Sequence, residues 1–96
     1  KGSTTYVAND SVLIQLPVAP PWLATAGTGD VLAGIIGALV ATNMIEILND
    51  SNHLAAVAAT GAFIHARAAD IASNGGPINA EAIIGQIPRV ISQLIK

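Results

Sequence analysis

The chain begins with two short stretches, residues 3–8 and 11–18, that are rich in β-branched side chains and typical of strands. Asn9 and Asp10 lie between them, and both residue types tolerate a positive φ angle. We therefore predict a β-hairpin with a two-residue turn. A loop is expected next, because three prolines follow within a few residues and lack the N–H groups that strand pairing needs: Pro17, Pro20 and Pro21.

The pattern changes over residues 30–42, where no polar side chain stands between Asp30 and Thr42. A helix that is apolar on every side is typically buried. Small residues share one face of it and allow another backbone to approach closely: Ala33, Gly34, Gly37, Ala38 and Ala41. The run is too short to span a membrane, so we predict a helix over 30–42 pressed against a sheet.

Apolar residues at steps of three and four predict a second helix that runs to about Ser73. Asp50, Ser51 or Asn52 can cap its start. Residues 75–77, Gly-Gly-Pro, are expected to end it. The stripe expected in the core consists of Leu54, Val57, Gly61, Ile64, Ala68 and Ile71.

A third helix is predicted after Asn79, which can cap it, with Glu81 favourably placed in its first turn. Pro88 would kink this helix or divide it in two. Residues 1–96 show no repeat, low-complexity tract or linker. The whole pattern predicts a β-hairpin followed by three helices within a single domain.

Composition suggests that this domain is larger than the chain. Of the 96 residues, 52% are apolar and only 10% are charged, whereas a soluble domain usually carries about 25% charged residues. Either partner chains cover the surface, or the chain is a piece of a larger buried domain, and we favour the second reading. Net charge −2 without a basic stripe argues against nucleic acid, and the absence of cysteine excludes disulfides and thiolate sites. Neither a secretory signal pattern nor a membrane span is evident, so we expect a cytoplasmic protein.

Polar chemistry is concentrated in the segment Gly27-Thr28-Gly29-Asp30, which we call the 27–30 turn. Two glycines allow successive N–H groups to point into one concavity, and the following helix adds the positive end of its dipole. Together they suit a phosphate or a transferring phosphoryl group. Asp30 would be repelled by bound phosphate, and a general base that accepts a hydroxyl proton is one reason to keep it there. The alternative is that Asp30 only caps the helix or complements its dipole. The spacing fits neither a dinucleotide-binding fingerprint nor a P-loop.

The wider sequence resembles a known family. Residues 23–36 are similar to the signature of the ADP/ATP-dependent NAD(P)H-hydrate dehydratases of the ribokinase-like superfamily, often described as carbohydrate kinases. Residues 1–5, Lys-Gly-Ser-Thr-Thr, look like the family's nucleotide-contacting segment. Residues 65–70 resemble its His-Gly-x-Ala-x-Asp helix, and Ile87-Pro88 resembles its late Ile-Pro. Gly-Thr-Gly-Asp alone is shared across the superfamily, whereas the longer match is more specific.

This resemblance implies an α/β fold, a mostly parallel sheet with helices on both faces, of which the chain is the C-terminal portion. It implies that ADP or ATP, with Mg²⁺, phosphorylates the hydroxyl of hydrated NADH or NADPH and that phosphate then leaves. By the same resemblance Asp30 is the base and faces the hydrated dinucleotide. The nucleotide would be contacted by Lys1, Gly2, Ser3, Thr4, Thr5 and Gly29, and the anion hole would be formed by Gly27, Thr28 and Gly29. The expected partners are the remainder of the same domain and further copies of the chain.

Some positions depart from the family pattern. Residues 20–22, Pro-Pro-Trp, replace its frequent Asn-Pro-Gly, and Ala66 stands where glycine is usual. Two other functions stay open: a small-molecule or vitamin kinase of the same superfamily, and a non-catalytic helical assembly module.

Several other polar or aromatic residues are better explained by a structural role than by a catalytic one. We expect His65 to be packed, His53 to be solvated, and Arg67 to form a surface pair with Asp70. The two histidines make a weak metal site. Trp22 fits loop packing.

Overall fold

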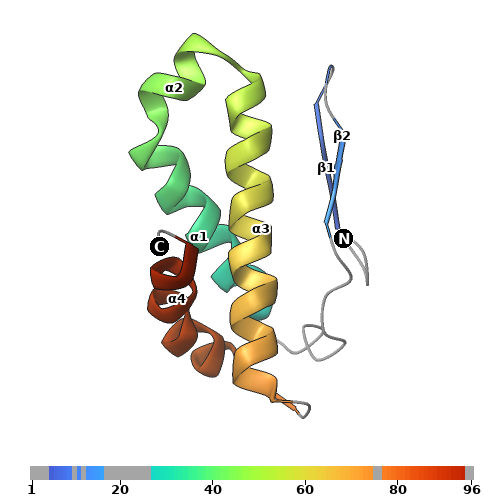
Figure 1. The fold of residues 1–96 in the computed structure, drawn as a ribbon, viewed down its shortest axis with the longest axis vertical. Coiled ribbons are helices and arrows are strands. Elements are labelled where there is room, and N and C mark those ends of the chain that lie inside the picture. Colours follow the sequence, from blue (N-terminus) through green and yellow to red (C-terminus); the bar gives the residue numbers. More distant parts are fainter. Residues whose placement is uncertain (1–4, 10, 12, 17–26, 75–76, 95–96) are drawn as a thin grey trace.

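The computed structural model describes residues 5–9, 11, 13–16, 27–74 and 77–94. The elements in these ranges are β1 (Tyr6–Ala8), β2 (Leu13–Gln15), α1 (Thr28–Thr42), α2 (Met44–Asn49), α3 (Asn52–Ser73) and α4 (Ala80–Leu94). Helix α3 is the centre of the arrangement (Figure 1). The hairpin lies along one side of it, and α2, α4 and most of α1 lie along the other. The predicted hairpin and helices are present, with a fourth helix added.

The two strands pair antiparallel, but the predicted two-residue turn is wrong. Ala8 pairs with Leu13, so residues 9–12 form the connection. This register places Val7 opposite Ile14, and these are the half-buried residues of the two strands. Pairing of the inward-facing side chains therefore sets the register, not the turn-forming tendency of Asn9 and residue 10. The mostly parallel sheet implied by the resemblance is not part of the described residues, whose sheet is this antiparallel pair.

Helix α1 begins two residues earlier than predicted and is much less covered than its sequence suggests. Thr28 is its only fully buried residue. The five small residues of its predicted contact face are all exposed in the chain: Ala33, Gly34, Gly37, Ala38 and Ala41. The described strand that packs against a helix is β1, and it packs against α3. The prediction that the small face of α1 lies against a sheet is thus not met within the described residues.

The close approach between helices is made instead by α3. Gly61 is buried, and a methyl group added there would stand 2.7 Å from Cγ1 of Ile36 in α1. A glycine on α3 therefore receives a large side chain of α1, which reverses the predicted roles of small and large residues.

Helix α2 was not predicted. Its six residues turn the chain between α1 and α3, and none of them is buried. Ile45 and Leu48 are 74% and 78% exposed. A helix this short shows too few residues for its periodicity to be recognised in the sequence.

Helix α3 starts and ends near the predicted positions. The Asn52 N–H donates to Oδ1 of Asp50 (3.0 Å), and the helix ends at Asn74, which adopts a left-handed φ of 45°. Of the predicted stripe, Val57, Gly61, Ile64 and Ala68 are buried and Ile71 is partly buried. Leu54 is the exception at 45% exposure, because it lies beside open space next to the hairpin.

Helix α4 has the predicted cap, since the Ala82 N–H donates to Oδ1 of Asn79 (2.8 Å). The helix continues through Pro88 and is not divided. Pro88 has no N–H to donate to the carbonyl of Ile84, and Ile84 is 53% exposed, so solvent can satisfy that carbonyl.

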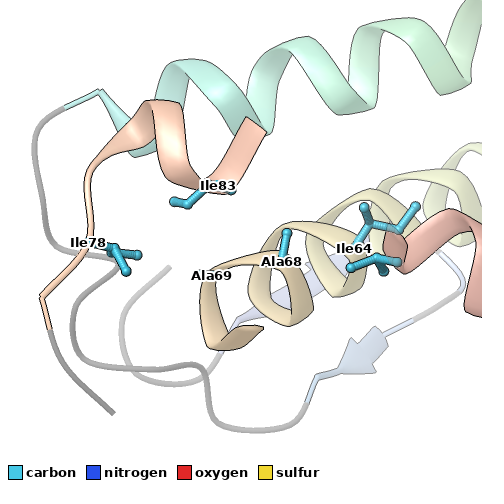
Figure 2. Packing of buried hydrophobic residues seen from close by; sticks show 6 residues of the cluster. Ile64, Ala68, Ala69, Ile78 and Ile83 are labelled. Carbon is cyan, nitrogen blue, oxygen red and sulfur yellow. The ribbon is translucent and has the colours of Figure 1, made fainter. Parts of the chain in front are cut away.

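The hydrophobic core lies where α3 meets α1 and α4 (Figure 2). Its buried members are Ile64, Ala68, Ala69, Ile78, Ile83 and Val90. By length and composition α3 is also apolar enough to cross a membrane, the one such helix among the described residues. Half of that window is buried inside the fold, as in the core helix of a globular domain.

Candidate functional site

The 27–30 turn is built around a backbone conformation that favours glycine. Gly27 precedes α1 with φ 86° and ψ −10°, in the left-handed region. A side chain there costs about 1–2 kcal/mol, because its Cβ crowds the following carbonyl. An added methyl group would also stand 3.3 Å from Cβ of Ala80, at the start of α4. Glycine at position 27 therefore allows both a φ that would strain other residues and the close approach of Ala80.

The first turn of α1 carries backbone N–H groups that the helix itself does not use. The Val31 N–H donates to the Gly27 carbonyl (3.3 Å), which is the first hydrogen bond of the helix. Helical geometry leaves the N–H groups of Gly27, Gly29 and Asp30 without an acceptor inside α1. Thr28 is 5% exposed, while an added methyl group at Gly29 would meet no atom within 4 Å. The turn thus presents N–H groups and a dipole end beside an open glycine, which suits an anion.

Asp30 lies at the edge of an apolar groove. The groove has a volume of about 530 Å³ and runs between α1 and α4, with Ile64 of α3 among its lining residues. The α4 side is lined by Ile84, Ile87 and Ile91. Asp30 is the only ionisable residue among the described residues that line it. Its side chain is exposed, and no hydrogen bond or ion pair of its carboxylate is found within the described part of the chain.

The start of α1 distinguishes between the two structural roles considered for Asp30, capping the helix and complementing its dipole. The cap position of α1 is taken by Gly27, which provides no side-chain hydrogen bond. Asp30 therefore does not act as the N-cap, although its place in the first turn complements the helix dipole. Its carboxylate is available to accept a proton from a molecule bound at the turn.

The predicted nucleotide segment is described only at its last residue. Thr5 is half-buried, and its carbonyl accepts the Leu16 N–H (2.9 Å) at the end of the hairpin. Lys1, Gly2, Ser3 and Thr4 lie outside the described residues, as do Trp22 and the two prolines before it.

Both histidines are packed. The predicted burial of His65 is confirmed, with 1% exposure in α3. The prediction that His53 is solvated is wrong in part, because the residue is half-buried and its Nε2 atom is buried. His53 lines a small cavity of about 160 Å³ between the end of α1 and the start of α3.

The predicted surface pair is confirmed, since Nη1 of Arg67 lies 3.2 Å from Oδ2 of Asp70, both exposed. No group of three or more His, Cys, Asp or Glu side chains in the described ranges can hold a metal ion.

One residue of the site, Ala80, could not be predicted from the sequence. Ala80 contacts the 27–30 turn from a helix more than fifty residues away. No spacing rule in the sequence could signal that contact, because it depends on how α1 and α4 meet.

Comparison with known proteins identifies the family. A family model described as NAD(P)H-hydrate dehydratase matches residues 1–89. The chain belongs to the NAD(P)H-hydrate dehydratase family. The match includes the 27–30 turn and the hairpin, and it ends within α4.

Several NAD(P)H-hydrate repair proteins are similar to the chain. A bifunctional NAD(P)H-hydrate repair enzyme Nnr of Mycobacterium leprae is 38% identical over 99% of this chain and 17% of its own length. An ADP-dependent (S)-NAD(P)H-hydrate dehydratase of Neisseria meningitidis is 36% identical over 91% of this chain and 27% of its own. The Nnr enzyme of Coxiella burnetii is 40% identical over 79% of this chain and 14% of its own. The chain thus spans roughly a quarter or less of these dehydratase-family relatives. No solved structure matches it.

Proposed function

We propose that the chain is the part of a nucleotide-dependent NAD(P)H-hydrate dehydratase that binds phosphate and carries the catalytic base. One observation carries the proposal: the family match covers the 27–30 turn, whose N–H groups, open glycine and single carboxylate suit phosphoryl transfer. The remainder of a ribokinase-like domain would complete the site, with a mostly parallel sheet behind it.

In the proposed reaction Asp30 accepts the proton of the substrate hydroxyl as its oxygen attacks phosphorus. The bond between that phosphorus and the nucleotide's bridging oxygen breaks, and the electron pair leaves with the shortened nucleotide. Gly27, Thr28 and Gly29 donate N–H groups to the oxygens of the transferring phosphoryl group, where negative charge is concentrated. The nucleotide supplies only the phosphoryl group.

The phosphate ester formed in this way is unstable because of the substrate, not the protein. The ring nitrogen of the hydrated nicotinamide donates its electron pair as the carbon–oxygen bond to phosphate breaks. Loss of a proton from the neighbouring carbon then restores the reduced nicotinamide ring. The apolar groove beside Asp30 would limit the access of water to this step.

Nucleotide contacts are proposed for Lys1, Gly2, Ser3, Thr4 and Thr5, together with Gly29. This assignment rests on the family resemblance of residues 1–5. The name of the Neisseria relative supports ADP as the donor, while ATP stays open. The described residues form no cluster of His, Cys, Asp or Glu side chains that would hold Mg²⁺.

The proposal is tested with the full-length protein, purified NADH hydrate, Mg²⁺ and either ADP or ATP. The absorbance of reduced nicotinamide should return, with one inorganic phosphate released per turnover. Return of the absorbance without nucleotide would contradict the phosphorylation step. Accumulation of a stable phosphorylated sugar or vitamin, without action on the hydrate, would favour the kinase alternative. Absence of nucleotide binding would favour an assembly module.

A further inference from the structure

The start of α4 is held firmly next to the 27–30 turn. Ile78 and Ile83, which flank it, are both buried in the core (Figure 2). Between them, Asn79 accepts the Ala82 N–H with its side chain (2.8 Å) and the Ile83 N–H with its carbonyl (3.4 Å). The first residue of α4 is therefore fixed by the core on both sides.

That first residue, Ala80, stands against Gly27. A methyl group built on Gly27 would lie 3.3 Å from Cβ of Ala80, so the two backbones are separated by little more than one methyl group. Ala80 is half-buried, so a larger side chain at this position has little room on the side that faces Gly27. Because α4 is anchored by Ile78 and Ile83, we expect the turn, and not the start of α4, to shift when this side chain is enlarged.

We propose that Ala80 is a positioning residue whose methyl group holds the left-handed turn at Gly27, and with it the direction of the N–H groups of residues 27–29. This inference rests on the proposed function, because those N–H groups form the proposed anion hole. Displacement of a donor by about 1 Å can cost on the order of 10²-fold in rate. A larger residue at position 80 should therefore act on turnover without touching the substrate.

The test compares Ala80→Val and Ala80→Leu with Ala82→Val and Ala82→Leu in the full-length enzyme. Ala82 lies on the same helix, is exposed, and undergoes the same loss of helix propensity. We expect the Ala80 variants to lose kcat by about 10- to 100-fold, more for leucine, with KM for NADH hydrate changed by less than about threefold. Ala80→Ser, which keeps Cβ and adds only a hydroxyl group, should keep kcat close to that of the unmodified enzyme.

Hydrogen exchange of a peptide spanning residues 27–31 gives a readout that does not need activity. It should be faster in Ala80→Val than in Ala82→Val, at equal overall stability. Equal kcat and equal exchange in these two variants would overturn the inference. If the unmodified protein has no dehydratase activity, the proposed function fails, and the exchange comparison alone then decides the role of Ala80.

Discussion

Asp30 is the single charged residue of α1, and its carboxylate stands at the edge of an apolar groove with no ion pair in the described residues. Asp30→Asn keeps the shape of the side chain and removes only its ability to accept a proton. We expect turnover of NADH hydrate to fall by about 10²–10⁴-fold. The Kd for nucleotide, measured by calorimetry, should stay nearly unchanged. Activity within a few-fold of the unmodified enzyme would mean that Asp30 serves only the helix dipole.

The two glycines of the same turn should respond differently to alanine. Gly29 is open, so Gly29→Ala should leave the melting temperature nearly unchanged or raise it, while the added methyl group obstructs phosphate and lowers nucleotide affinity first. Gly27→Ala is the matched comparison, because its positive φ should cost about 1–2 kcal/mol of stability. Melting curves with and without nucleotide separate the two effects. A Gly29→Ala protein with normal affinity would argue against phosphate binding at this glycine.

Between elements, Gly61 of α3 leaves room for the side chain of Ile36 of α1. Gly61→Ala would place a methyl group 2.7 Å from Cγ1 of Ile36, closer than such atoms approach. We expect a loss of about 1–3 kcal/mol in the free energy of unfolding, measured with denaturant on the full-length protein.

Gly85→Ala in α4 is the control for the Gly61 substitution. Gly85 is exposed, and an added methyl group there meets nothing within 4 Å. It should stabilise the helix by about 0.5–1 kcal/mol. Equal effects at both positions would show that α1 and α3 separate easily at this contact.

At the scale of elements, local sequence signals were sufficient to predict the caps and the helix interiors, but not the contacts between elements. The cap at Asn79 and the length of α3 follow from short-range chemistry, and both were predicted. The hairpin register, the exposure of Leu54 and the contact of Ala80 with Gly27 depend on tertiary packing. The 27–30 turn was found because glycines and a lone carboxylate in apolar sequence are unusual. The contact of this turn with Ala80 of α4 has no local signal in the sequence.

For the whole molecule, the described surface is too apolar for an isolated domain. Large apolar side chains are exposed on the hairpin and on α2, α3 and α4, namely Tyr6, Leu13, Met44, Ile45, Leu48, Leu54, Ile84, Ile91 and Leu94. The small face of α1 is open as well. Such a surface is typical of one that other segments or other chains cover.

We therefore expect residues 1–96, produced alone, not to form a stable monomer. Circular dichroism melts at several concentrations, combined with ultracentrifugation, would check this. Broad or concentration-dependent transitions are expected. A cooperative melt of a monomer that does not change with concentration would contradict the prediction.

The hairpin is attached to the helices in a way that bears on ligand binding. Strand β1 packs against α3, and the side chain of Asn9 donates to Oδ1 of Asn52 (3.1 Å). Contacts between segments so distant in sequence carry a loop-closure cost, and such elements can open locally while the rest of a fold persists. If residues 1–5 contact nucleotide as proposed, then docking of the hairpin and binding of nucleotide are thermodynamically linked. Each must strengthen the other by the same factor, so bound nucleotide would stabilise the docked hairpin as well as take part in the reaction.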